Sequence, residues 1–176
     1  MKRTILGTIA VVLFTSAISC FAPKVKDKRV VKLDPSIKTV NLSGEIGLDT
    51  ITSIGVSQLG LKDLKIVIVS LTEKEVKENE TLLGYIEDYQ TYYLIKLKSG
   101  LYKDYYLTIL SHELQHLKDL NSGRLKQLYY GFWFDGVVYT WNYSYWDRKF
   151  EQRAFEGKFE LEMKIRYKMM NPLSGT

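Results

Sequence analysis

YKDYYLTILSHELQHLKDLN, at residues 102–121, has the periodicity of a long amphipathic helix. Gly123 lies just past its end as a stop signal. One face carries apolar residues at helical spacing, namely Leu107, Leu110, Leu114 and Leu117. The opposite face is expected to be solvated and holds Thr108, Ser111, Gln115, Lys118 and Asp119. The pattern therefore predicts a helix whose leucine face packs on the core of the domain.

His112 and His116 stand in this helix four residues apart, so both imidazoles lie on one face and can bind one Zn²⁺. They are the only 2 histidines of the chain. Glu113 falls inside the apolar arc, where an unpaired carboxylate is costly, so the role of a surface glutamate fits it poorly. A glutamate in this place can activate a water at the metal. The spacing therefore predicts a zinc site rather than two surface histidines beside a salt-bridged glutamate.

A catalytic zinc site needs a third protein ligand, and since no histidine remains, a carboxylate has to serve. The last helix, expected over Asp147 to about Met170, offers Glu151, Glu156, Glu160 and Glu162. The second and third of these point away from the buried arc of that helix. Glu151 lies within the arc beside the small Ala154, which lets two helices approach, so Glu151 is the predicted ligand. Glu162 is the second choice, and a structural ion pair with Lys158 is the alternative.

These residues resemble the gluzincins, zinc metallopeptidases in which an HExxH helix is followed by a second helix whose glutamate completes the site. The matched residues are His112, Glu113, His116 and Glu151, the last within a Glu-x-x-Ala sequence, and the similarity covers roughly residues 65–170. The resemblance implies an α+β, zincin-like fold with one Zn²⁺ per chain. It also implies peptide bonds as the substrate and Glu113 as the general base. The acidic residue that often orients a histidine in this family has no clear equivalent.

Aromatic residues crowd the stretch Tyr129–Trp146, which includes all 3 tryptophans. Asp135-Gly136 predicts a hairpin there, between strands at 128–134 and 137–143. Cross-strand pairing accounts for most of these rings. Because the hairpin joins the two ligand-bearing helices, we expect it near the metal. The candidates for stabilising an oxyanion are Tyr139, Tyr143 and Tyr145.

The rest of the body, residues 37–176, is predicted to form one domain with a small mixed sheet packed on the HExxH helix. Strands are expected at 38–42 and 65–71, and a second hairpin at 82–88 and 91–98. A helix over Asp49–Leu59 is expected to be capped by Asp49. Thr72 and Glu75 predict a capping box that starts a short helix.

The first 19 residues predict a signal peptide, which is not part of the folded domain. A positive head, Met1-Lys2-Arg3, precedes an apolar run at 5–18 that is too short for the roughly 20 residues of a membrane-spanning helix. The run ends at Cys20, the only cysteine, and resembles a bacterial lipoprotein signal in which that cysteine receives a diacylglyceryl anchor before cleavage. Residues 20–36 then form a lipidated basic tether. Ordinary secretion with cleavage near Ser19 and an uncleaved anchor are the alternatives.

The composition, 45% hydrophobic and 26% charged, excludes pervasive disorder, and one cysteine excludes a disulfide framework or a cysteine-rich zinc module. The net charge of +5 falls to about +3 when Lys2 and Arg3 are removed, a weak case for nucleic acid. The sequence therefore predicts a zinc metallopeptidase, anchored to a membrane of the bacterial envelope through Cys20, that acts on a peptide or protein substrate. The alternative is a non-catalytic zincin-like lipoprotein whose site is structural. The oligomeric state stays open.

Overall fold

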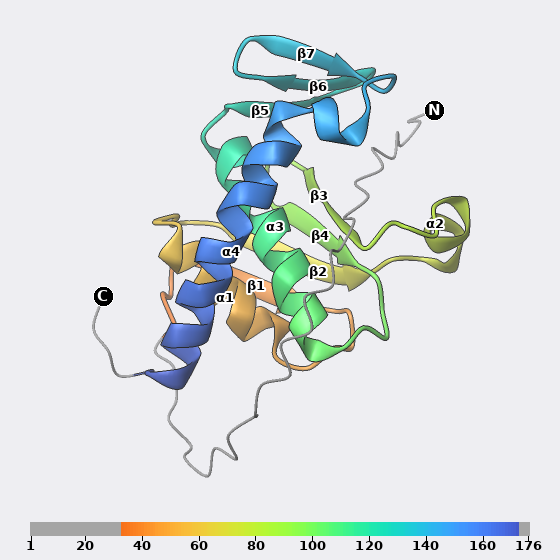
Figure 1. Ribbon diagram of the computed structural model, residues 1–176. Helices are drawn as coiled ribbons and strands as arrows, with labels where there is room; N and C mark the ends of the chain where they lie inside the picture. The colour runs from red at the N-terminus through yellow and green to blue at the C-terminus, as the bar shows by residue number, and fades with distance from the viewer. Residues whose placement is uncertain (1–32, 173–176) are drawn as a thin grey trace.

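The larger of two β-sheets has four strands in the order β1-β2-β4-β3 (Figure 1). Their bounds are β1 (Lys38–Asn41), β2 (Lys65–Ser70), β3 (Gly84–Asp88) and β4 (Tyr93–Leu97). β1, β2 and β4 are parallel, and β3 pairs antiparallel with β4, so the predicted mixed sheet and its hairpin are confirmed. This computed structural model describes residues 33–172. Residues 1–32, which hold the predicted signal peptide, Cys20 and most of the tether, lie outside the described residues.

Alternation along the strands decides which face of this sheet is covered. Ile66, Ile68 and Ile95 are completely buried and point to the side on which the helices pack. Val67 and Val69, at the intervening positions of β2, are only half-buried. One face of the sheet is therefore the floor of the main core.

Three helices form that core: α1 (Leu48–Gln58), α3 (Lys103–Asn121) and α4 (Lys149–Met170). α1 and α3 pack on the sheet, and α4 packs on both of them (Figure 1). The four leucines of the predicted apolar face of α3 are buried as predicted. Ser111 and Asp119 are buried too, so the prediction that they face solvent is wrong, because α4 covers that side of α3.

Glycines let the helices approach α3 closely. A side chain at Gly55 of α1 would collide with Leu114, and one at Gly157 of α4 would collide with Gln115. Gln115 instead donates a hydrogen bond from Nε2 to the Gly157 carbonyl oxygen at 3.0 Å. The predicted close approach of α3 and α4 beside the fully buried Ala154 is confirmed. This contact fixes the relative position of the two helices that carry the predicted ligands.

The smaller sheet contains β5 (Leu125–Leu128), β6 (Gly131–Phe134) and β7 (Val137–Thr140), all antiparallel. The hairpin around Asp135-Gly136 is confirmed, but the single strand predicted at 128–134 is wrong, because a turn at Tyr129-Tyr130 divides it. Gly131 is required just after that turn, since a side chain there would collide with the Tyr139 backbone. The sheet lies at the N-terminal end of α4, which follows the 3-10 helix η1 (Tyr145–Asp147) (Figure 1).

Phe150 joins the smaller sheet to the helices. Its ring lies 5.0 Å from that of Phe132, 5.7 Å from that of Tyr139 and 5.8 Å from the His116 imidazole, between ring centroids. These rings are buried, so the aromatic residues near the end of α4 serve mainly as core. Phe150 therefore also packs against the imidazole of His116.

Helix starts differ in how they are capped. The prediction that Asp49 caps α1 is wrong: the cap residue is Gly47, with a φ of 85°, and Asp49 lies in the first turn. A glycine reaches this left-handed conformation at little cost, so the chain can turn sharply into the helix. The short helix α2 (Glu73–Glu78) begins with the predicted capping box of Thr72 and Glu75.

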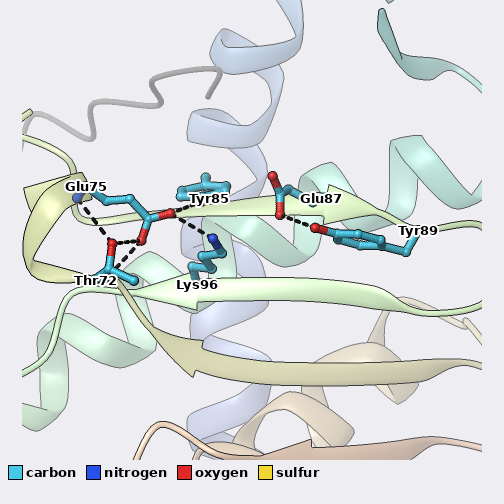
Figure 2. Close-up of polar contacts among 6 residues, drawn as sticks. All are labelled: Thr72, Glu75, Tyr85, Glu87, Tyr89 and Lys96. Carbon is cyan, nitrogen blue, oxygen red and sulfur yellow. Dashed lines mark hydrogen bonds and ion pairs between the residues drawn. The ribbon is translucent and has the colours of Figure 1, made fainter. Parts of the chain in front are cut away.

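The capping box belongs to a larger group that we name the Glu75 cluster: Thr72, Glu75, Tyr85 and Lys96 (Figure 2). Glu75 Oε1 accepts hydrogen bonds from the Tyr85 hydroxyl at 2.5 Å and from Lys96 Nζ at 2.7 Å. Its Oε2 accepts from the Thr72 backbone N–H and hydroxyl, both at 2.7 Å. Burial alone would raise the pKa of Glu75, but the bonds from Lys96, Tyr85 and Thr72 lower it to about 2. The cluster attaches α2 to β3 and β4, on the face of the sheet opposite the main core.

Within residues 33–172, no helix combines the length and the apolar character needed to cross a membrane.

Candidate metal centre

His112 and His116, from α3, meet Glu151, from the first turn of α4, in the interior of the protein. Glu151 Oε2 lies 3.3 Å from His112 Nε2 and 3.1 Å from His116 Nε2. The two Nε2 atoms are 3.1 Å apart. The structure therefore brings together the three residues that were predicted from the sequence as metal ligands.

The spacing of these three atoms fits a metal ion. Ligand atoms held about 2.0–2.1 Å from a tetrahedral ion lie roughly 3.3 Å from one another, close to the three separations found here. Two imidazoles and one carboxylate are also a donor set that divalent transition metals accept. His112, His116 and Glu151 thus form a candidate metal centre that could hold one ion.

Burial makes this centre costly without a cation. His112, Glu113 and Glu151 have no exposed surface, and His116 is 1% exposed. Among residues 33–172, neither oxygen of Glu113 has a hydrogen-bond partner, and the same is true of Glu151 Oε1. Buried carboxylates without partners are unfavourable, and a cation is a group that could satisfy these oxygens.

The electrostatics of the three ligands point the same way. Burial lowers the pKa of His112 to about 4, which leaves a neutral imidazole that can bind a metal. Burial opposes ionisation of Glu151, but the two histidines lower its pKa to about 2, so it stays charged. For His116, burial favours the neutral form, yet the Glu151 carboxylate raises its pKa. In the absence of a metal, His116 and Glu151 thus behave as an ion pair.

Glu113 differs from Glu151 although both are buried acids. Its carboxylate is not among the three clustered ligands, and burial raises its pKa to about 8. A carboxyl group with such a pKa can exchange protons near neutral pH. Glu113 is therefore placed beside the ligands as a candidate acid–base group and not as a ligand.

Two alternatives from the sequence are not found at this centre. Glu162 Oε2 accepts a hydrogen bond from the Thr108 hydroxyl at 2.9 Å, and Arg166 lies 2.8 Å from its Oε1, so Glu162 is a link between α3 and α4. Lys158 forms no ion pair with an acidic side chain of residues 33–172. Its Nζ lies 4.0 Å from the ring centroid of Phe155 and 4.9 Å from that of Phe159.

Only one of the three candidate tyrosines is close to the ligands. The Tyr145 hydroxyl lies 3.4 Å from His112 Nε2. Tyr139 packs on Phe150 in the core, and Tyr143 is 44% exposed and stacks edge-on against Tyr139. Burial, followed by the charge of Glu151, raises the pKa of Tyr145, so its hydroxyl keeps its proton and can donate it in a hydrogen bond.

Two charged residues near the centre were not identified from the sequence. Asp119 is 1% exposed, lies 3.1 Å from Arg153 Nε and adds to the negative charge around His116. Asp119 is three residues after His116, so both lie on one helix face. This spacing could have identified Asp119 from the sequence as a neighbour of His116. Arg148, one turn before Glu151, is 7% exposed, and its Nη2 donates to the Tyr143 carbonyl oxygen at 3.0 Å.

Comparisons of the chain with protein-family models, with curated proteins and with solved structures find no match. The functional interpretation therefore depends on the residues of this centre alone.

Proposed function

We propose that the protein is a zinc metallopeptidase of the gluzincin type, with a zincin-like fold, that hydrolyses peptide bonds. The observation that carries this proposal is the buried group of His112, His116 and Glu151 with the unpartnered carboxyl of Glu113 beside it. The helix that holds HExxH packs on a mixed sheet and against the helix that supplies the third ligand, which agrees with such a fold.

The chain supplies the groups that peptide hydrolysis requires. His112, His116 and Glu151 would hold the ion, which when bound supplies Lewis-acid polarisation of a carbonyl group and of water. Glu113 would accept a proton from the attacking water and deliver it to the leaving amine. The Tyr145 hydroxyl would donate a hydrogen bond to the carbonyl oxygen as that oxygen gains negative charge.

The choice of zinc rests on Glu113. A set of two histidines and one carboxylate also suits Fe²⁺ in oxygen-activating sites. The buried carboxyl of Glu113 follows the ligand His112 directly and has no hydrogen-bond partner among residues 33–172, which suits proton transfer in hydrolysis instead. Metal analysis of the purified chain separates the two, and we expect one Zn²⁺ per chain.

A second candidate is a non-catalytic protein in which zinc has a structural role. The observation that favours it is that the centre is closed to solvent. All three ligands and Glu113 are at most 1% exposed, and the Tyr145 hydroxyl adjoins His112. A structural site has a closed coordination shell, whereas a catalytic one keeps a position for water. Exchangeable water on the bound metal therefore favours the enzyme.

The decisive experiment uses the parent and Glu113→Gln, loaded with zinc and offered a broad peptide library. Glutamine keeps the shape of the side chain and removes the base. We expect Glu113→Gln to keep one zinc and the fold and to lose peptide turnover by about a hundredfold or more. Exchange of the solvated Glu156 of α4 for glutamine is the matched control and should change nothing. Equal behaviour of the parent and Glu113→Gln, with zinc bound and no cleavage in either, would establish the structural alternative.

We also propose that the protein is anchored to a membrane of the bacterial cell envelope through Cys20. The support is the sequence of residues 1–36: a basic head, a short apolar run, a lone cysteine and a basic tether. Cys20→Ser should abolish acyl labelling and release the protein from the membrane fraction. Unchanged labelling in that variant would refute the anchor.

A further inference from the structure

Arg148 is a buried cation whose hydrogen-bonding capacity is largely unused. It is 7% exposed, and its Nη2 donates to the Tyr143 carbonyl oxygen at 3.0 Å. Its Nε and Nη1 have no hydrogen-bond partner among residues 33–172. No acidic side chain of that part of the chain lies within ion-pair distance of it.

Such an arrangement is unfavourable for the fold by itself. A guanidinium cannot escape burial by losing its proton, so its charge and its free N–H groups are desolvated without compensation. Lys158 shows the contrast, because it is also buried, at 2% exposed, but places its ammonium over the rings of Phe155 and Phe159. Burial also lowers the pKa of Lys158, which eases its desolvation. Arg148 has no such contact with an aromatic ring among residues 33–172.

The position of Arg148 connects it with the metal centre. It precedes α4 directly and stands one helical turn before the ligand Glu151. Tyr145, whose hydroxyl lies 3.4 Å from His112 Nε2, is three residues earlier in the same short segment. An anion bound to Arg148 would therefore lie beside the site of the proposed reaction.

The acids of the centre do not neutralise Arg148. Glu151 is already shared by the two histidines. The guanidinium is then one positive charge in excess, with donors suited to a carboxylate. The missing acceptor has to come from outside the described fold.

We propose that Arg148 binds a carboxylate of the substrate, so that the site prefers peptides with a carboxylate close to the scissile bond. The proposal adds a substrate class to the proposed peptidase function. The carboxylate has two sources, the C-terminus of a peptide or an acidic side chain, and both present the same planar acceptor to the guanidinium.

Stability provides the first test, and it needs no turnover. Arg148→Met keeps most of the apolar stem and removes the unpaired charge, so the melting temperature of the unliganded protein should rise by about 2–6 °C. Lys149→Met is the matched control, because Lys149 is the exposed neighbour and loses the same charge. It should leave the melting temperature unchanged. A fall in Arg148→Met would give the guanidinium a structural role and overturn the proposal.

Binding provides the second test, in full-length, zinc-loaded protein carrying Glu113→Gln so that no probe is cleaved. The probes are N-acetyl-Gly-Phe-Leu as the free acid, the same peptide as its amide, and N-acetyl-Gly-Phe-Glu amide. We expect one or both carboxylate probes to bind at least about tenfold more tightly than the neutral amide. The probe with the greater affinity identifies the source of the carboxylate. Adding Arg148→Met should reduce the preference to less than about twofold, and adding Lys149→Met should not.

Two outcomes of the binding test overturn the proposal. One is equal affinity of all three probes for the protein with Arg148 intact. The other is a preference that survives Arg148→Met, which would mean that the metal alone holds the carboxylate. If Arg148→Met does not fold, Arg148→Gln decides in its place, because it keeps a donor for the Tyr143 carbonyl and still removes the charge. Failure of the peptidase proposal is separate: the parent would bind the acid probes and cleave none.

Discussion

Two buried acid clusters of this protein are built in opposite ways. In the Glu75 cluster both carboxylate oxygens accept hydrogen bonds, from Lys96, Tyr85 and Thr72. At the candidate metal centre, both oxygens of Glu113 and one of Glu151 have no partner among residues 33–172. The first cluster is complete within the fold, and the second leaves buried acceptors to which a metal ion could bind.

The pKa values express the same difference. The protein's own donors lower the pKa of Glu75 to about 2, whereas burial without donors raises that of Glu113 to about 8. A buried acid with hydrogen-bond donors stabilises the folded state. A buried acid without them destabilises it and is therefore a candidate functional group. The comparison teaches that the distribution of hydrogen-bond partners, more than burial, separates a structural carboxylate from a functional one.

The largest expected effect is that of Glu151→Gln at the metal centre. A neutral amide is a weak ligand, so the affinity for Zn²⁺ should fall by about a hundredfold or more, and peptide turnover with it. The melting temperature should lose the increase that zinc binding gives the parent, because an ion bound only to the native state stabilises it. Zinc stoichiometry and melting curves with and without chelator measure both effects.

The control for Glu151→Gln comes from the other cluster. Glu75→Gln removes a charge of equal size from an acid that is also buried, yet it should leave zinc affinity unchanged. Full zinc content and full activity in Glu151→Gln would show that the third ligand is elsewhere, with Glu162 the next residue to test.

Tyr145→Phe should have the next largest effect, on activity and not on stability. The hydroxyl lies 3.4 Å from His112 Nε2, and the proposed mechanism uses it on the developing oxyanion. Loss of such a donor costs about a hundredfold in turnover. The measurement is peptide turnover beside zinc content and melting temperature, which should stay at parental values. Tyr143→Phe, at an exposed tyrosine, is the control, and equal turnover in both variants would refute the role of Tyr145.

Much of this contrast could be predicted from the sequence because it depends on local periodicity. The four-residue spacing of His112 and His116 fixes their common face, and helical phase was sufficient to choose Glu151 over Glu162. The capping box of Thr72 and Glu75 is likewise a local pattern, and it is confirmed. These predictions needed only the geometry of one helix at a time.

What the sequence did not predict depends on contacts between elements. Ser111 and Asp119 are buried because α4 covers a second side of α3, and the wheel of α3 alone contains no information about that helix. Tyr85 and Lys96 come to Glu75 from two strands, so the completion of that cluster has no local signal. The turn at Tyr129-Tyr130 was hidden by a continuous aromatic run, although Gly131 marked it.

Glu75→Gln tests the structural half of the comparison. The substitution removes charged hydrogen bonds and leaves Lys96 partly buried without its partner, so the free energy of unfolding should fall by about 2–3 kcal/mol. The melting temperature should fall by roughly 5–10 °C. Thermal unfolding in the presence of chelator measures this without a contribution from zinc. Exchange of the exposed Glu78 for glutamine is the control and should cost much less.

The effect of Glu75→Gln should also depend on pH in a defined direction. The pKa of Glu75 is lowered from 4.5 to about 2, so the native state binds its proton less readily than the unfolded chain does. Its contribution is therefore fully present above about pH 4.5 and is lost as the pH falls toward 2. The difference in unfolding free energy between the parent and Glu75→Gln should be constant from pH 5 to 7 and should shrink toward pH 2. A difference that grows on acidification would contradict the assignment.

The smallest effect should come from Tyr85→Phe, the structural counterpart of Tyr145→Phe. Tyr85 is 2% exposed, and its hydroxyl donates to Glu75 Oε1 at 2.5 Å. Without that hydroxyl, Lys96 Nζ still reaches the same oxygen at 2.7 Å, so the carboxylate keeps a donor on both oxygens. The cost should therefore be about 1 kcal/mol of unfolding free energy, with zinc content and peptide turnover unchanged. Denaturant unfolding measures the loss. A loss of turnover in Tyr85→Phe, at full zinc content, would show that the Glu75 cluster takes part in the reaction, and the division between a structural and a functional acid would then fail.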